Sequence, residues 1–248
     1  MTIHSDEIGV APEQSWEWAR KILPRRMQPM VRGLRKRLLR RTLRLDEPYH
    51  TVFPYTQVAL IRQENIVRLA KLIERNKIPG AIVECGVLDG GVAALMAWAT
   101  SSSPRPVHLF DAWQGLPNPS TNDGSAAIKW KGQVVGSPRR VKAVMKKLNV
   151  AKERVHFHVG WFADTFPKAS IDRIALLHID PDFYDPVKLC LSHWYDHISP
   201  GGYIQIDDYE AFSGCRKATD EFLAAHPEAE LEFYGDGPKA FFIRKPRP

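Results

Sequence analysis

Cysteine is scarce in this sequence, and the three that occur, Cys85, Cys190 and Cys215, lie far apart in the 248 residues. An odd number without CxxC or Cys/His spacing predicts neither a disulfide framework nor a zinc site. Long apolar runs are also missing, since no stretch approaches the roughly 20 residues that a membrane-spanning helix needs. The first ten residues lack the basic-then-apolar pattern of a secretory signal. These absences favour a soluble or peripheral protein, and we expect it to be cytoplasmic.

Acidic residues are absent from one long segment, between Arg20 and Arg44, which carries eleven cations. The formal net charge of +7 therefore belongs to this segment, because the remainder has 24 basic and 28 acidic residues. The apolar residues of the arm around this segment recur at helical spacing and predict a basic amphipathic helix: Met27, Met30, Val31, Leu34, Leu38 and Leu45. We place an N-terminal basic helical arm at 1–48 and the main domain at 49–248.

Three partners suit such an arm: an anionic membrane surface, a second subunit, or the chain's own domain. We favour packing on protein, beside the mouth of the site or across a homodimer. Nucleic acid is not expected, because no zinc finger, helix-turn-helix or RNP-type motif accompanies the charge.

Strands and helices alternate after a first predicted helix at 56–76. The predicted strands are 81–86, 106–113, 154–161, 173–180, 201–209, 229–235 and 239–245, and the helices between them are 91–102, 139–149, 185–198 and 214–226. This order predicts an α/β fold with a doubly wound, mostly parallel sheet, whose ligands lie beyond the carboxyl ends of the strands. The tight turn between the last two strands implies one antiparallel strand. The polar segment 115–138 has the composition of a loop or lid.

Four aspartates follow two of the predicted buried strands: Asp180 and Asp182 after the first, Asp207 and Asp208 after the second. A buried carboxylate without a partner is unfavourable, so this arrangement indicates a bound cation, a set of hydrogen-bonded hydroxyls, or both. The alternative is that these aspartates cap the helices that follow.

A glycine-rich turn follows the first strand and reads Glu84-x-Gly86-x-x-x-Gly90-Gly91. Glycine permits positive φ and close approach of the backbone to a ligand. The spacing differs from the G-x-G-x-x-G of dinucleotide sites and favours a ligand without phosphates. Asp111, which closes the second strand, lies where an acid can bond a ribose diol. A plain tight turn also accounts for these glycines.

Six motifs in this order resemble the macrocin O-methyltransferase family over about residues 50–245: IPGAIVECGVLDGGV, HLFDAWQGLPNP, GWFADTFP, LLHIDPDFYDP, ISPGGYIQIDDY and GCRKATDEF. The resemblance implies a class I, Rossmann-like methyltransferase that uses S-adenosylmethionine and a metal ion to methylate hydroxyls, often on sugars of natural products. Pro181 departs from the glycine common in the family, and YDP departs from its usual YxS/T, while the acids are intact.

The resemblance also implies roles for individual residues. Mg²⁺ would be held by Asp180, Asp207 and Asp208, and Asp182 would be the general base. S-adenosylmethionine would be held by Glu84, Gly86, Asp111, Gly160, Trp161, Phe162 and Asp180. For Trp161 the alternative is core packing. His178 lies within a buried strand and is expected to be a hydrogen-bonded core residue rather than a catalytic one.

We favour a sugar or glycoside as the small-molecule acceptor, with a phenol or catechol as the alternative, because both offer vicinal oxygens. Two other functions remain at this stage. The D-x-D spacing of Asp180 and Asp182 also occurs in glycosyltransferases that bind nucleotide sugars through a metal. A non-catalytic binding protein with the same fold is the last alternative.

Overall fold

The computed structural model describes Met27, Leu34 and residues 45–247. The predicted basic arm therefore lies almost wholly outside the described residues, and its helix and its partners stay predictions. Within the described part, no helix combines the length and the apolar character needed to cross a membrane.

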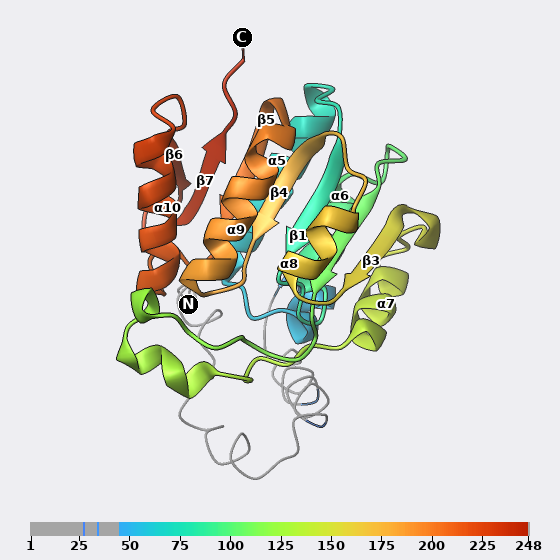
Figure 1. Ribbon diagram of the computed structural model, residues 1–248. Helices are drawn as coiled ribbons and strands as arrows, with labels where there is room; N and C mark the ends of the chain where they lie inside the picture. The colour runs from blue at the N-terminus through green and yellow to red at the C-terminus, as the bar shows by residue number, and fades with distance from the viewer. Residues whose placement is uncertain (1–26, 28–33, 35–44, 248) are drawn as a thin grey trace.

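A seven-stranded sheet in the order β3-β2-β1-β4-β5-β7-β6 forms the centre of the molecule (Figure 1). The strands are β1 (Ala81–Cys85), β2 (Val107–Asp111), β3 (Val155–Val159), β4 (Ile174–Ile179), β5 (Ile198–Ile206), β6 (Leu231–Tyr234) and β7 (Ala240–Arg244). The strands from β3 to β5 pair in parallel, and β7 is antiparallel to both of its neighbours. The predicted doubly wound sheet with an antiparallel last strand is confirmed.

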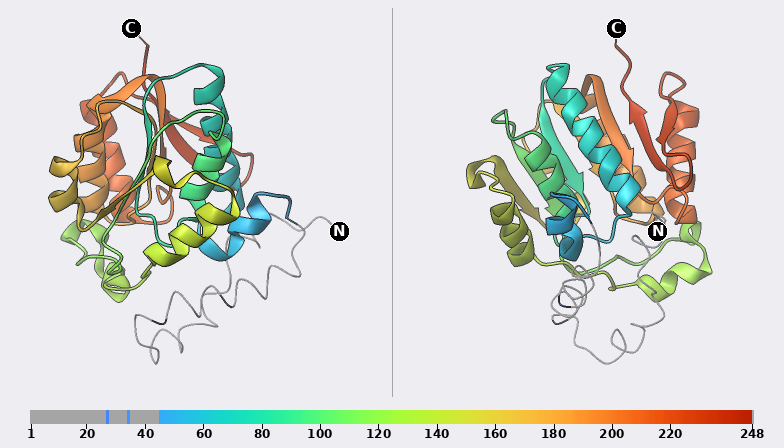
Figure 2. Two further views of the ribbon diagram at one scale, coloured as in Figure 1. Left: turned by 90° about the vertical axis from the view of Figure 1, so that its right-hand side faces the viewer. Right: turned by 180° about the vertical axis from the view of Figure 1, so that it is seen from behind.

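Helices cover both faces of this sheet (Figure 2). One face packs against α4 (Tyr49–Val52), η3 (Phe53–Tyr55), α5 (Leu60–Arg75), α6 (Gly91–Ala99) and α7 (Pro138–Lys147). The other packs against α8 (Phe162–Thr165), η7 (Phe166–Lys168), α9 (Tyr184–Trp194), η8 (Tyr195–His197) and α10 (Ser213–Ala225). All six residues of β4 are buried, as expected for a parallel strand covered on both faces.

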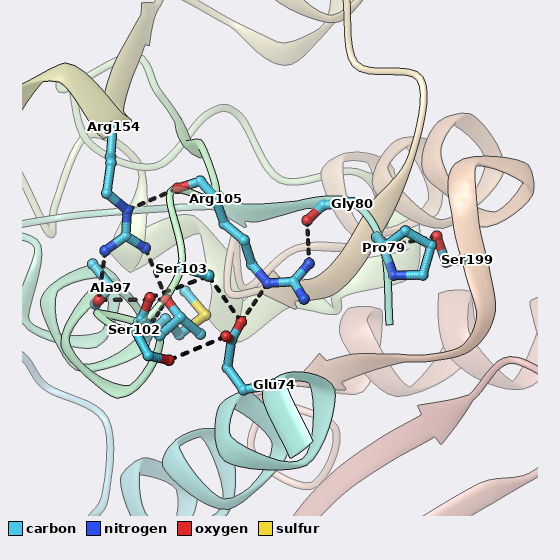
Figure 3. Close-up of polar contacts among 11 residues, drawn as sticks. Glu74, Pro79, Gly80, Ala97, Ser102, Ser103, Arg105, Arg154 and Ser199 are labelled. Carbon is cyan, nitrogen blue, oxygen red and sulfur yellow. Dashed lines mark hydrogen bonds and ion pairs between the residues drawn. The ribbon is translucent and has the colours of Figure 1, made fainter. Parts of the chain in front are cut away.

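A polar network joins the loops at the amino edge of the sheet (Figure 3). Arg105 donates to the Gly80 carbonyl at 2.6 Å and pairs with Glu74 at the end of α5. Arg154, at the end of η6 (Lys152–Arg154), donates to the carbonyls of Arg105 at 2.8 Å and Ala97 at 3.1 Å. These bonds fix the chain ahead of β1, β2 and β3, and the opposite, carboxyl edge carries the predicted site.

The segment 115–138 runs along this carboxyl edge and contains two short 3₁₀ helices, η4 (Thr121–Asp123) and η5 (Ser125–Trp130) (Figure 1). It is thus more regular than the loop that its composition predicts. Asp123 anchors it, because its carboxylate accepts from the Ser120 N–H at 2.7 Å and from the Tyr184 N–H, at the start of α9, at 2.7 Å. The segment is therefore tied to the loop that carries Asp182.

Candidate active site

The aspartates after β4 and β5 come together because these strands are neighbours in register, Ile179 opposite Ile206. One carboxylate oxygen from each of Asp180, Asp207 and Asp208 lies within 4.8 Å of the others. These acids do not cap helices: the N-cap residues of α9 and α10 are Phe183 and Phe212, and the side-chain oxygen that accepts from the first N–H of α9 belongs to Asp123. The capping interpretation is therefore wrong for this pair of strand ends.

Asp182 joins this cluster from the loop between β4 and α9. Its φ of +62° is in the left-handed region, which aspartate tolerates better than most residues. Its carboxyl interacts electrostatically with those of Asp208 and Asp207. Burial and the neighbouring Asp208 hold the pKa of Asp182 well above its usual value, and burial together with Asp207 does the same for Asp180. The four acids therefore repel one another and require positive charge nearby.

The donor set fits a hard divalent cation. Three carboxylates converge, and their oxygens are the ligands that Mg²⁺ prefers. Two of the three side chains, those of Asp207 and Asp208, are buried, and a buried carboxylate is retained only where a cation or a donor compensates it.

Arg62 is a residue of this site that the sequence analysis missed. It lies in the first turn of α5, and its Nη1 donates to the Asp207 carbonyl at 2.6 Å and to Asp207 Oδ2 at 2.7 Å. The same atom forms an ion pair with Asp208 Oδ1 at 3.4 Å. One signal was available: Arg62 shares a helical face with Ile66 and Leu69, so it places a charge on the buried side of an amphipathic helix.

The glycine turn packs directly against the acid cluster. Gly86 has a φ of +89°, and a Cβ built on it would lie 2.2 Å from the Asp180 carbonyl oxygen. Gly90 has a φ of +83° and lies against Val141 of α7, where a Cβ would come within 2.8 Å of a methyl group. The glycines are thus required by packing as well as by conformation, and the turn lies immediately beside the strand end that carries Asp180.

Glu84 and His178 lie beneath this turn, fully buried. His178 Nδ1 is 3.0 Å from Glu84 Oε1, and its Nε2 is 3.8 Å from Asp207 Oδ1. Burial alone would lower the pKa of His178, but the carboxylates of Asp207 and Glu84 raise it to about 9. The expectation of a hydrogen-bonded core histidine agrees with this geometry. Glu84 Oε2 has no hydrogen-bond partner among the residues that the structure describes.

Asp111, at the end of β2, organises the glycine turn. Its Oδ2 accepts from the N–H groups of Val87 and Leu88, both at 2.9 Å, and its Oδ1 accepts from the Trp113 N–H at 2.6 Å. Burial raises the pKa of Asp111, and the backbone hydrogen bonds oppose that shift. The carboxylate therefore holds the turn in shape, whatever ligand it also binds.

Two adjacent aromatic residues after β3, Trp161 and Phe162, have different environments. Trp161 is 40% exposed, so the core-packing alternative is wrong for it. Phe162 instead stacks on the buried Phe166, with ring centroids 5.0 Å apart and planes at 8°. Gly160, just before them, has a φ of +145°. Trp161 is thus available to a ligand, and Phe162 mainly joins the α8–α9 core.

Comparison with known proteins identifies the family. The family model described as macrocin O-methyltransferase (TylF) matches residues 14–231. The chain belongs to the macrocin O-methyltransferase family. It is 33% identical over 178 residues, 68% of each chain, to demethyldecarbamoylnovobiocin O-methyltransferase of Streptomyces niveus. It is 30% identical over 190 residues, 73% of this chain and 74% of the relative, to mycinamicin III 3''-O-methyltransferase of Micromonospora griseorubida.

Solved structures agree with this assignment. The O-methyltransferase NovP has a TM-score of 0.71 and 30% identity, over 78% of this chain and 83% of NovP. The calicheamicin methyltransferase CalS11 has a TM-score of 0.66 at 18% identity, which shows a common fold. This macrocin-family chain is therefore an S-adenosylmethionine-dependent O-methyltransferase, and the glycosyltransferase and non-catalytic alternatives do not hold.

Proposed function

We propose that this O-methyltransferase transfers a methyl group from S-adenosylmethionine to a hydroxyl of a sugar or glycoside, with Mg²⁺ held by Asp180, Asp207 and Asp208. The observation that carries the proposal is the convergence of three carboxylate oxygens within 4.8 Å beside the glycine turn. Relatives that act on glycosides support the acceptor class: one is the mycinamicin III enzyme, and another is a rhamnosyl-tetracenomycin C 4'-O-methyltransferase of Streptomyces olivaceus.

The cofactor would lie along the glycine turn, held by the residues that the resemblance implies: Glu84, Gly86, Asp111, Gly160, Trp161, Phe162 and Asp180. The unpartnered Oε2 of Glu84 would accept from the amino group of the methionine moiety. Asp111 would accept from ribose hydroxyls in addition to its backbone donors. The exposed ring of Trp161 would cover the adenine. Phe162 would support the position of Trp161 rather than cover the adenine, because its own ring is already stacked on Phe166.

Asp182 would serve as the general base. A magnesium ion held by the other three aspartates would lower the pKa of the acceptor hydroxyl and would fix its position. Asp182 interacts with Asp208 and Asp207, so its carboxylate is placed beside the proposed ligands.

Aromatic residues border the acids on the side that we assign to the acceptor. The ring of Phe212 lies 6.2 Å from that of Trp130 in η5, which with Ile128 forms the rim, and 6.1 Å from that of Phe183, which is buried behind it. Ile128, in the same 3₁₀ helix as Trp130, is 61% exposed. This apolar rim suits an acceptor sugar that is attached to an apolar aglycone, because the aglycone needs an uncharged surface.

The test is a methyl-transfer assay with labelled S-adenosylmethionine and a panel of glycosides and catechols, run with Mg²⁺ and with a chelator. We expect transfer to a glycoside, loss of activity with the chelator, and recovery with added Mg²⁺. Asp182→Asn should reduce kcat by about 10²-fold or more. The matched control is Asp185→Asn, since Asp185 is exposed on the first turn of α9. Transfer only to catechols would establish the alternative acceptor, and full activity after chelation would exclude the metal.

The homodimer and the basic arm are part of the same proposal. Deleting residues 1–45 should change the mass measured by light scattering if the arm packs across a dimer. An unchanged mass and activity would contradict that role, and binding of the full chain alone to anionic vesicles would assign the arm to a membrane surface instead.

A further inference from the structure

Arg62 places a permanent positive charge among the proposed metal ligands. Its Nη1 lies 2.7 Å from Asp207 Oδ2 and 3.4 Å from Asp208 Oδ1, and its side chain is 21% exposed. A guanidinium keeps its charge at every pH at which the protein folds. A change of pH therefore does not remove the charge of Arg62 from the two carboxylates; only a movement of the side chain does. Two of the three proposed ligands are therefore already neutralised in part by the chain itself.

A divalent cation would need the same oxygens that Arg62 contacts. The ligand oxygens of the three aspartates lie within 4.8 Å of one another, and Arg62 bonds to two of these residues. A cation with Mg–O distances of about 2.1 Å to these oxygens would lie close to the guanidinium. Two like charges in a buried site repel strongly.

Arg62 also has a contact that a metal would leave intact. Nη1 donates to the Asp207 backbone carbonyl at 2.6 Å, and this oxygen does not belong to the carboxylate cluster. The guanidinium can therefore give up the carboxylates and keep a hydrogen bond nearby. The structure thus offers two ways to compensate the same acids, one by Arg62 and one by a divalent cation.

We propose that Arg62 is an internal counter-cation that competes with the divalent metal for Asp207 and Asp208. It keeps the acid cluster compensated when no metal is bound, and it lowers the affinity for the metal. The inference rests on the proposed function, because it takes these aspartates as the metal site. It predicts a reversible metal exchange in which the Arg62 side chain turns away from the carboxylates as the ion enters.

The experiment measures Mn²⁺ binding to the full chain by the loss of the free-ion EPR signal, and Mg²⁺ binding by calorimetry, without cofactor or acceptor. The variants are Arg62→Gln, Arg62→Lys and Asp207→Asn. The control is Arg68→Gln, on the same helix, whose guanidinium stacks on Tyr234 and Phe242 away from the acids. We expect Arg62→Gln to bind Mn²⁺ about tenfold more tightly than the wild type, the factor for loss of one competing charge-assisted hydrogen bond. Arg68→Gln should bind as the wild type does.

A second measurement separates competition from a structural role. Without metal, Arg62→Gln should melt at a lower temperature than the wild type, and saturating Mg²⁺ should raise its melting temperature more than that of the wild type. Equal or weaker metal binding by Arg62→Gln would overturn the inference. If Arg62→Gln does not fold, Arg62→Lys decides. The path to the lysine nitrogen is one atom shorter than the path to Arg62 Nη1, so the ammonium should reach the carboxylates less closely, and this variant should bind Mn²⁺ more tightly than the wild type.

The two proposals fail differently. If the wild type binds Mn²⁺ and Asp207→Asn does not, the metal site stands, and the behaviour of Arg62→Gln judges the competition alone. If neither the wild type nor Arg62→Gln binds Mn²⁺, the proposed metal site itself is wrong, and the competition is overturned with it.

Discussion

His178 and Glu84 face each other across two neighbouring parallel strands, and His178 Nδ1 lies 3.0 Å from Glu84 Oε1 with both side chains buried. This pair lies under the glycine turn and within 3.8 Å of Asp207 through His178 Nε2. The proposed cofactor side and the proposed metal side are therefore joined by one buried imidazole. Burial opposes the charged imidazole, while Asp207 and Glu84 raise the pKa of His178 to about 9, so an imidazolium at this position would offset the charge of both carboxylates.

The first prediction is that His178→Ala destabilises the fold by about 3 kcal/mol or more, because Glu84 is left as a buried charge without a partner. Urea unfolding measures the change. Glu84→Gln should reduce the loss in a double variant, since the neutral amide needs less compensation. Strictly additive effects would show that the two side chains do not interact. His50→Ala is the control, because His50 belongs to an exposed pair with Glu47 and should change stability little.

The second prediction separates the metal ligands from the cofactor residues. Asp207→Asn and Asp180→Asn should abolish transfer and reduce Mn²⁺ affinity at least about tenfold, because each removes one anionic oxygen ligand. S-adenosylmethionine affinity, measured by calorimetry, should change far less in Asp207→Asn, because Asp207 is not among the proposed cofactor residues, whereas Asp180 is. A parallel collapse of cofactor binding in Asp207→Asn would mean that this acid serves the cofactor rather than the metal. Asp185→Asn again provides the exposed control.

The third prediction concerns Trp161 and Phe166, two aromatic residues of one segment with opposite environments. Trp161→Ala should weaken S-adenosylmethionine binding about tenfold and change stability by less than about 0.5 kcal/mol, because Trp161 is exposed. Phe166→Ala should destabilise the fold by about 3–5 kcal/mol, because Phe166 is buried among aromatic rings. Calorimetry and urea unfolding of both variants decide. Normal cofactor binding by Trp161→Ala would remove Trp161 from the site.

The fourth prediction is a pH dependence from the histidines of β2 and β3. Burial and the neighbouring His156 and His158 lower the pKa of His108 to about 4. Protonation below the unfolded value of about 6.5 therefore favours the unfolded chain, and stability is lost as the pH falls from about 6.5 to about 4. His108→Leu should make the free energy of unfolding fall less steeply over this range, and His158→Leu should act in the same direction. Curves parallel to the wild type would contradict this origin.

The local features of the fold were readable from the sequence for specific reasons. The buried strand 174–179 is apolar except for His178, and such a run has few alternatives in a chain whose strands alternate with helices. The glycines at 86, 90 and 91 predict a turn between strand and helix. The short turn before the last strand implied its antiparallel direction. Each of these signals lies within about ten residues of the structure that it specifies.

Arg62 and Asp123 show where such reasoning stops. Arg62 meets Asp207 across 145 positions of sequence, and Asp123 meets the Tyr184 N–H across 61. The sequence around Arg62 or around Asp123 does not predict which residue each one will contact. The polar composition of the segment 115–138 predicts a loop. Its two 3₁₀ helices depend on Asp123, which is anchored by Tyr184 of α9 and Ser213 of α10.

The sequence by itself determined the kind of fold, the edge of the sheet at which we propose the site, and the acids and glycines proposed to form it, because strand periodicity and turn chemistry are local properties. Only the tertiary structure decided how the acids are compensated. Strand order brought β4 beside β5 and so gathered the aspartates, and packing of α5 on the sheet delivered Arg62 into them. Those contacts depend on which elements become neighbours when the apolar faces are buried. The arrangement of the elements depends on the apolar faces of all helices and strands together, so no local segment determines it.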